Sequence, residues 1–313
     1  MALERLDRYR GSLLGLAVGD ALGAPVEGNS PGTFDPVTEM TGGGTAGLAA
    51  GQWTDDTAMA LCLAESLTER GGFHPPDQMA RYVKWYREGY LSSTGTCIGI
   101  GETTRAALER FEATGDPFSG SLNPMTAGNG SIMRLAPVAM FYARQPLTAL
   151  MKCGDSSMTT HASVQAVDAC RYFGGLLVGA LSGESKETLL SGRYTPAPGF
   201  WDRYPLVPDI DRVALGSYRS MEPPDIQGSG YVAKSLEAAL WAFYRSCSFA
   251  EGALLAVNLG DDADTTAAVY GQLAGAYYGV QTIPDEWLGK LAKKEYIDEL
   301  ARKLCSQSEE VNG

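Results

Sequence analysis

Apolar residues recur at intervals of three and four along most of the chain, the spacing that places them on one face of an α-helix. No segment shows the sustained alternation of β-branched and polar residues that is typical of a half-buried strand. The fold class we predict is therefore all-α, a compact multi-helix bundle larger than a simple four-helix arrangement. The predicted helices cover residues 3–24, 53–69, 77–90, 101–113, 131–144, 161–182, 231–246, 248–258, 262–279 and 285–306.

The first of these helices carries Gly11, Gly15, Gly19 and Gly23, one glycine every four residues. Small residues at this spacing form a stripe that lets a second helix approach closely. The helix ends at a proline two residues after the last of these glycines, because proline cannot continue the hydrogen-bond ladder. The turn that follows presents Glu27, which is either a site residue or a solvated loop carboxylate.

Residues 184–230 interrupt the helical pattern with six prolines and several aromatic residues without periodicity. A segment of this length is too long for a plain connection between two helices. We therefore predict a single domain over residues 1–313, with a Pro-rich insertion or lid at about 184–230. Residues 29–52, rich in Gly, Pro and Thr, are predicted to form a surface loop.

The composition is that of an ordinary globular protein, with 44% hydrophobic and 20% charged residues. A net charge of −12 argues against nonspecific binding to nucleic acid, which needs clustered Lys and Arg. No apolar run is long enough to span a membrane and the first ten residues do not resemble a signal peptide, so we expect a cytoplasmic protein without a membrane partner. Two histidines are too few for a His-rich zinc site, and the six scattered cysteines indicate buried reduced thiols.

Three carboxylates, Asp261, Asp262 and Asp264, occur within four positions and are followed by Thr265 and Thr266. Crowded anions repel one another unless a positive charge lies among them. The N-terminus of the helix predicted to begin there offers only about half a charge. A divalent cation accounts better for the cluster, and Thr265 can add a neutral oxygen ligand.

A second acidic cluster, Thr54, Asp55 and Asp56, lies at another predicted helix start. Both clusters offer hard oxygen ligands, which suit Mg²⁺ or Mn²⁺ and disfavour zinc or copper. Together they offer more oxygens than one Mg²⁺ usually takes from protein, which indicates a pair of ions. Taken singly, each cluster is also explained by helix capping, because Asp and Thr are common at helix N-termini.

The loop formed by Gly128, Asn129, Gly130 and Ser131 precedes a predicted helix. Glycines at such a place let backbone N–H groups face an anion, although a simple turn with a cap has the same composition. Arg134 is interpreted either as a phosphate ligand or as half of a structural ion pair, and we favour the ion pair. His161, at the start of another predicted helix, is either a capping or core residue or a ligand contact.

These residues also match the motifs of a known family, in the order in which that family carries them. The chain resembles the ADP-ribosylglycohydrolases over nearly its whole length, most strongly from 228 to 279 and least in the insertion. The family includes the dinitrogenase-reductase-activating glycohydrolase, the ADP-ribosyl-acceptor hydrolases and crystallin-like proteins. The matching stretches are Gly19-Asp20-Ala21-Leu22-Gly23 with Glu27, residues 53–59, residues 128–134, Thr160-His161 and residues 260–265.

The resemblance implies an all-α fold with a dinuclear Mg²⁺ or Mn²⁺ centre in a cleft. It implies that Glu27 and Asp56 act at the scissile bond, that Asp261 is an outer or capping residue, and that His161 lies near the bound nucleotide. The 128–131 loop would cradle the diphosphate of ADP-ribose. The metal ligands implied are Thr54, Asp55, Asp56, Asp262, Asp264 and Thr265.

One position departs from the family pattern. Where many relatives carry an aspartate implicated in handling the leaving group, this chain has Gly99. The departure leaves three alternatives: a different acceptor, replacement by nearby Glu102, or an impaired enzyme.

The function we expect is metal-dependent hydrolysis of the glycosidic bond between ADP-ribose and a modified protein or small acceptor. The competing interpretations are an ADP-ribose-binding or crystallin-like structural protein without turnover, and a ribonucleoside hydrolase. We prefer the enzyme, because acidic clusters that destabilise a fold usually mark a functional site.

Overall fold

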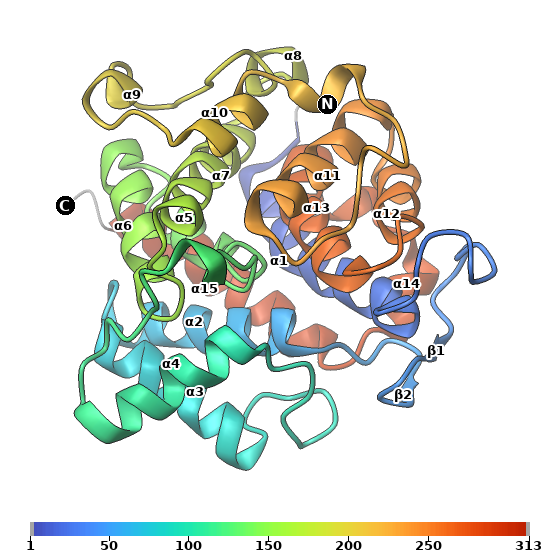
Figure 1. The fold of residues 1–313 in the computed structure, drawn as a ribbon, viewed down its shortest axis with the longest axis horizontal. Helices are drawn as coiled ribbons and strands as arrows, with labels where there is room; N and C mark the ends of the chain where they lie inside the picture. The colour runs from blue at the N-terminus through green and yellow to red at the C-terminus, as the bar shows by residue number, and fades with distance from the viewer. Residues whose placement is uncertain (1–2, 311–313) are drawn as a thin grey trace.

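The computed structural model describes residues 3–310, and α-helices make up most of them, which confirms the all-α prediction (Figure 1). Within this range the only strands are β1 (Gly42–Gly43) and β2 (Leu48–Ala49), an antiparallel pair inside the predicted surface loop. The helices are α1 (Arg5–Gly23), η1 (Ala24–Val26), α2 (Asp55–Arg70), α3 (Pro75–Glu88), α4 (Glu102–Thr114), η2 (Pro124–Thr126), α5 (Ala136–Phe141), α6 (Pro146–Met158), α7 (Val164–Ser182), α8 (Lys186–Leu189), α9 (Phe200–Arg203), α10 (Pro208–Ala214), η3 (Ser217–Ser220), α11 (Val232–Arg245), α12 (Phe249–Val257), α13 (Ala263–Tyr278), η4 (Val280–Thr282), α14 (Asp285–Lys290) and α15 (Lys294–Glu310).

Three helix predictions differ from the structure. The helix predicted over 131–144 is reduced to α5, which has a proline in its first turn, where the missing N–H costs least. Helix α6 was not predicted, although Pro146 at its first position is a start signal. The helix predicted over 285–306 is two helices, because the backbone of Ala292 is bonded elsewhere: its N–H donates to Gly51 O (2.9 Å) and its carbonyl accepts from Trp53 Nε1 (3.1 Å).

The segment predicted to be an insertion, 184–230, contains the short helices α8, α9, α10 and η3. In Figure 1 it crosses the top of the molecule, in yellow, and its helices pack against α7 and α11. The hydroxyl of Tyr231, just beyond the segment, donates to Asp209 Oδ2 (2.6 Å) at the start of α10. The segment is thus fixed to the bundle by both apolar packing and a hydrogen bond.

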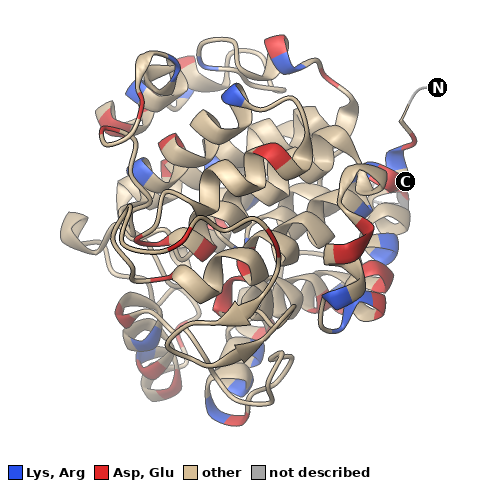
Figure 2. Cartoon of the chain, turned by 90° about the vertical axis from the view of Figure 1, so that its right-hand side faces the viewer, with Lys and Arg blue, Asp and Glu red and all other residues tan. Residues whose placement is uncertain are grey.

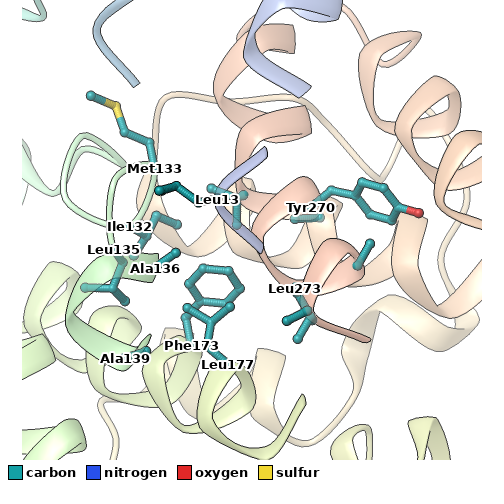
Figure 3. Close-up of a cluster of buried hydrophobic side chains, with 14 of the residues drawn as sticks. Leu13, Ile132, Met133, Leu135, Ala136, Ala139, Phe173, Leu177, Tyr270 and Leu273 are labelled. Carbon is teal, nitrogen blue, oxygen red and sulfur yellow. The ribbon is translucent and has the colours of Figure 1, made fainter. Parts of the chain in front are cut away.

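The buried core joins helices from distant parts of the chain. Figure 3 shows Leu13 of α1, Phe173 and Leu177 of α7 and Leu273 of α13 converging on one cluster, with side chains of α5 beside them. Each of these four side chains is at most 1% exposed. Burial of side chains of this size stabilises a fold by about 1.5–3 kcal/mol each. The core therefore fixes how α1, α7 and α13 are arranged.

The glycine stripe of α1 is the contact surface for α13, and this pair makes the most extensive helix contact of the structure. A Cβ added at Gly15 would lie 2.4 Å from the carbonyl oxygen of Gly271, and one at Gly19 would lie 2.1 Å from that of Ala267. At the end of the stripe, a Cβ at Gly23 would lie 2.4 Å from the Cα of Asp264. The helices approach this closely because α1 has no side chain at these positions, which brings the end of α1 onto the start of α13.

Charged residues are unevenly placed. In Figure 2 the Lys and Arg segments lie mainly on the outer helices, whereas Asp and Glu also occur toward the centre of the view.

The described residues contain no helix with the length and hydropathy needed to cross a membrane. All six cysteines are free: Cys62, Cys153 and Cys170 are buried, and Cys247 is exposed.

Candidate metal centre and binding cleft

The start of α2 is held by a carboxylate from another helix. Asp20, buried in α1, accepts hydrogen bonds from the backbone N–H and the hydroxyl of Thr54 (both 2.9 Å). Its second oxygen accepts from the N–H (3.0 Å) and the hydroxyl (2.6 Å) of Thr57. Thr54 occupies the N-cap position, yet its own side chain makes no capping bond. The capping expected of the local residues is therefore supplied by Asp20, which leaves Asp55 and Asp56 free for another role.

The two acidic clusters, far apart in the sequence, meet at this point. Thr54 Oγ1 lies 3.3 Å from Asp56 Oδ2 and 3.3 Å from Asp264 Oδ2. Thr265 Oγ1 lies 3.4 Å from Asp56 Oδ2. One carboxylate oxygen each from Asp20, Asp56 and Asp264 lie within 4.8 Å of one another. The ends of α1, α2 and α13 thus assemble a single group of oxygen atoms.

This group is electrostatically unbalanced as it stands. Burial, followed by the neighbouring carboxylates, raises the pKa of Asp55, Asp56 and Asp264 well above the usual aspartate range. Burial, and then Asp262 and Asp20, also raise the pKa of Glu27. Asp56 Oδ1 is buried and has no hydrogen-bond partner among the described residues. Carboxylates arranged in this way bind a cation or a proton.

Asp55, Asp262 and Asp264 line a cleft of about 490 Å³, a size usual for small-molecule sites, whereas Thr54 and Asp56 are not among its lining residues. No Lys or Arg lines the cleft within the described part of the chain, so a negatively charged ligand must be held by backbone dipoles, neutral donors or cations. The lining residues are Glu27, Gly28, Asp55, Gly99, Gly101, Glu102, Thr103, Thr104, Gly128, Asn129, Gly130, Met133, His161, Gly230, Asp261, Asp262, Asp264 and Thr265. Of the 184–230 segment, only Gly230 is among them.

The 128–131 loop forms one wall of the cleft, but only part of its backbone is available to a ligand. The N–H of Gly128 donates to Thr126 O (2.8 Å) and that of Asn129 to Gly230 O (3.0 Å). The N–H groups of Gly130 and Ser131 have no acceptor among the described residues. Of the N–H groups that were expected to bind an anion, only those of Gly130 and Ser131 therefore remain available.

Asn129 joins this loop to the acidic cluster. Its side-chain amide donates to Asp262 Oδ2 (2.8 Å) and to Ser235 Oγ (3.2 Å). Asp262, not Asp261, is the N-cap residue of α13, and its side chain makes no capping hydrogen bond. Asp261 instead has a left-handed backbone (φ 52°), with its N–H and carbonyl bonded to the turn at residues 28–29.

Arg134 forms no ion pair with any residue that the structure describes, which corrects our preferred interpretation. It is completely buried, and its guanidinium donates to Gly130 O (2.6 Å) and Thr160 Oγ1 (2.7 Å). The guanidinium also lies over the ring of Tyr82, 4.8 Å from the centroid. It contacts the back of the loop rather than the cleft, so it is not a direct phosphate ligand either.

His161 lines the cleft and precedes α7, whose N-cap is Ser163. Burial, and then the charge of Arg134, lower the pKa of His161 to about 3. Its Nδ1 lies 2.8 Å from Thr160 Oγ1. His161 is therefore a neutral, oriented ring rather than a helix cap.

Gly99 faces the acidic cluster directly. Its backbone is left-handed (φ 84°), and a Cβ added there would lie 2.3 Å from Asp55 Oδ1. A side chain at this position would displace Asp55. Glu102 also lines the cleft, but both of its carboxylate oxygens accept from Arg105 Nη2, at 2.6 and 2.7 Å.

Two roles were not found by sequence reasoning. Asp20 was identified only as part of a motif, although a carboxylate inside an apolar helix is itself a signal of a buried polar partner. Thr160, which joins Arg134 to His161, carries no signal in the sequence because its importance depends on contacts between separate segments.

Comparisons with protein families, with known sequences and with solved structures agree with one another. The family model described as ADP-ribosylglycohydrolase matches residues 1–312. An ADP-ribosylarginine hydrolase, Tri1, of Pseudomonas putida (strain GB-1) is 42% identical over 309 residues, which cover 99% of this chain and 81% of the relative. An ADP-ribosyl-[dinitrogen reductase] glycohydrolase of Rhodospirillum rubrum is 31% identical, with 92% and 91% covered. A solved structure described as an "ADP-ribosylglycohydrolase-related protein complex" superposes with a TM-score of 0.86 at 48% identity, covering 97% of this chain and 99% of that one.

Proposed function

The chain belongs to the ADP-ribosylglycohydrolase family, and we propose that it is a Mg²⁺- or Mn²⁺-dependent hydrolase that releases ADP-ribose from a modified arginine of a protein. The names of relatives, which act on ADP-ribosylated arginine or on dinitrogen reductase, support the arginine acceptor. The observation that carries the proposal is the meeting of the two acidic clusters at the base of a cleft whose wall is the 128–131 loop.

The residues present fit a divalent cation. The buried, unpartnered Asp56 Oδ1 is an unused oxygen ligand. The Thr54 hydroxyl donates its hydrogen to Asp20 (2.9 Å), which leaves its lone pairs for a metal. Asp20 accepts four hydrogen bonds itself, so we assign it to positioning rather than ligation. The residues that would hold two ions are Thr54, Asp55, Asp56, Asp262, Asp264 and Thr265.

When bound, the cations supply Lewis-acid chemistry, orienting vicinal ribose hydroxyls and lowering the pKa of water. The chain's own carboxylates then serve as proton acceptors. Glu27 is partly exposed at the cleft and has a raised pKa, which suits a group that takes a proton from the attacking water and returns it to the leaving nitrogen. Asp56 is the second catalytic candidate. Water oxygen bonds to the anomeric carbon while the bond from that carbon to the acceptor nitrogen breaks.

The phosphates of the ligand would be held without Lys or Arg. Gly130 lines the cleft beside His161 and Ser131 follows it in the chain; the N–H groups of both have no acceptor among the described residues. Neutral donors of this kind bind a phosphate without adding a charge that would compete with the cations.

The test is release of ADP-ribose from an arginine-ADP-ribosylated protein, followed for the wild type, Asp56→Asn and Asp264→Asn with added Mg²⁺ or Mn²⁺ and with EDTA. We expect each variant, and EDTA, to lower turnover more than about 100-fold, because metal ligands are usually essential. Asp35→Asn, which removes an exposed carboxylate of the 29–52 loop, is the matched control. Unchanged turnover in both site variants would rule out the centre. Serine- and nucleic-acid-linked ADP-ribose, tested in parallel, identify the acceptor.

A binding protein without turnover is the competing function, and Gly99 is the observation that favours it. The cleft has no carboxylate at this position, and Glu102 is paired with Arg105. Calorimetric titration with ADP-ribose beside the hydrolysis assay distinguishes the two functions. Tight binding with no release from any of the three linkages would establish the binding protein.

A further inference from the structure

We propose that Arg134 and Thr160 are positioning residues that hold His161 in the tautomer with hydrogen on Nε2, so that the ring presents this N–H to the cleft. The identity of the ligand rests on the proposed function. The tautomer itself rests only on contacts within the chain.

Only one direction of the hydrogen bonds among these three residues gives the buried hydroxyl hydrogen of Thr160 an acceptor among the described residues. Arg134 Nη2 lies 2.7 Å from Thr160 Oγ1, and a guanidinium only donates. Thr160 Oγ1 therefore accepts from Arg134. Its one hydrogen has a single acceptor among the described residues, Nδ1 of His161 at 2.8 Å. Since Nδ1 accepts, a neutral imidazole carries its hydrogen on Nε2.

The ring is neutral at ordinary pH, so its tautomer decides what it offers the cleft. Arg134 lies behind the ring and, after burial, is the second cause of the pKa of about 3. With hydrogen on Nε2, the ring donates to an anion; with hydrogen on Nδ1, it would present a lone pair that repels one. Through its hydrogen bond to Thr160, the buried Arg134 therefore determines which nitrogen of the neutral His161 ring carries hydrogen.

The Nε2 edge of the ring faces the 128–131 loop and the cleft. A Cβ added at Gly130 would lie 2.7 Å from Cε1 and 3.1 Å from Nε2 of His161, and one at Gly128 would lie 3.4 Å from Nε2. Neither glycine has a positive φ, so the absent side chains matter here for space rather than for backbone conformation. Nε2 has no acceptor among the described residues, and His161 lines the cleft.

Arg134 also positions the loop itself. Its Nη1 donates to the carbonyl of Gly130 (2.6 Å), the residue whose N–H is available beside that of Ser131. One buried guanidinium thus fixes both the ring and the adjacent peptide. The result is a pair of neutral donors in the lining of the cleft, Gly130 N–H and His161 Nε2–H, with the N–H of buried Ser131 next in the chain.

The chain offers a direct measurement because it contains only two histidines, His74 and His161. Long-range ¹H–¹⁵N correlation spectra of the ligand-free protein show which nitrogen of each ring carries hydrogen. We expect a protonated Nε2 and an unprotonated Nδ1 for His161, without titration between about pH 5 and 8. His74, the N-cap residue of α3, supplies the second ring in the same spectra. A wild-type His161 protonated on Nδ1 would overturn the proposal.

Variants test whether Thr160 sets the tautomer. Thr160→Val removes the hydroxyl at nearly constant shape, whereas Thr160→Ser keeps it. We expect Val to populate the Nδ1–H tautomer and to weaken ADP-ribose binding by about tenfold or more, with a larger effect on KM than on kcat, and we expect Ser to restore both. Thr159→Val is the matched control, because Thr159 is equally buried but its hydroxyl bonds Ser156 O and Gln78. Wild-type tautomer and affinity in Thr160→Val would refute the inference.

The outcome is separable from that of the proposed function. A wild-type protein with the Nε2–H tautomer whose ADP-ribose affinity falls in Thr160→Val, but which releases no ADP-ribose, would support this inference and overturn the hydrolase. Loss of turnover in the Asp variants with the Nδ1–H tautomer in the wild type would do the reverse.

Discussion

Replacing Asp56 by Asn should make the metal-free protein more stable and should abolish its stabilisation by Mg²⁺. Carboxylate oxygens of Asp20, Asp56 and Asp264 lie within 4.8 Å of one another. At that separation two unit charges repel by about 3 kcal/mol with an effective dielectric constant of about 20. Partial protonation relieves some of this repulsion, so we expect a gain of about 1–3 kcal/mol near pH 8 in EDTA.

The gain should depend on pH in a defined direction. Burial and neighbouring carboxylates raise the pKa of Asp56 in the folded state. The protonated carboxyl therefore stabilises the fold fully below the unfolded pKa of about 4, and this contribution is lost as pH rises through the raised folded pKa. Asn does not titrate, so the difference between variant and wild type should vanish near pH 4 and grow toward alkaline pH.

Thermal unfolding, followed by circular dichroism in EDTA and in Mg²⁺, measures both effects. A change of 1 kcal/mol corresponds to roughly 2 °C in Tm for a chain of this size. Saturating Mg²⁺ at about 100 times its Kd should stabilise the wild type by about 2.7 kcal/mol and the variant by much less. Asp35→Asn controls for net charge. The reasoning is refuted if metal-free Asp56→Asn is no more stable than the wild type at pH 8, or if Mg²⁺ stabilises both equally.

Three further substitutions follow from the same geometry. Gly19→Ala places a Cβ 2.1 Å from the α13 backbone and should lower the free energy of unfolding by several kcal/mol, whereas Gly289→Ala, with open space around it, should change it by less than about 1 kcal/mol in urea titrations. Asp20→Asn replaces one of the two acceptor oxygens by a donor amide, which then faces one N–H and one hydroxyl of either Thr54 or Thr57; we expect a loss of about 2–4 kcal/mol and a large drop in Mg²⁺ affinity by calorimetry, and a variant that binds Mg²⁺ normally would contradict its positioning role. Gly99→Ala should displace Asp55 and weaken Mg²⁺ binding about tenfold or more, and unchanged affinity would show that Asp55 is not a ligand.

Gly99 also shows how the structure changes the meaning of a sequence observation. Compared with the family pattern, the glycine is a missing aspartate that could be restored. In this chain the backbone of Gly99 is left-handed, and a Cβ there would lie 2.3 Å from Asp55 Oδ1, so a side chain would have to displace Asp55. An aspartate introduced at position 99 would therefore disturb the acidic cluster. A comparison with relatives at this position has to include the residues around it.

What the sequence determined by itself is the information that lies within one segment. Apolar spacing identified most helices, the four-residue glycine stripe indicated a close helix contact, and crowded carboxylates at two helix starts indicated a cation. Each of these signals depends on neighbours within a few positions, since helix geometry relates residues three and four apart. The fold class is therefore predictable from the order of the amino acids alone, and the same order is enough to propose candidate site residues.

Only the tertiary structure decided which groups serve one another. Asp20 caps a helix that begins 35 positions later, Asn129 holds Asp262, and Arg134 reaches His161 through Thr160. Hydrogen bonds form between groups about 3 Å apart in space, whatever their separation along the chain. The composition of the 128–131 loop is compatible with four free N–H groups or with two. The sequence around Arg134 is likewise compatible with an ion pair or with a buried hydrogen-bond donor. Packing of α1 against α13 and of α2 across their ends selected one of these arrangements, because it fixes which acceptor each donor meets.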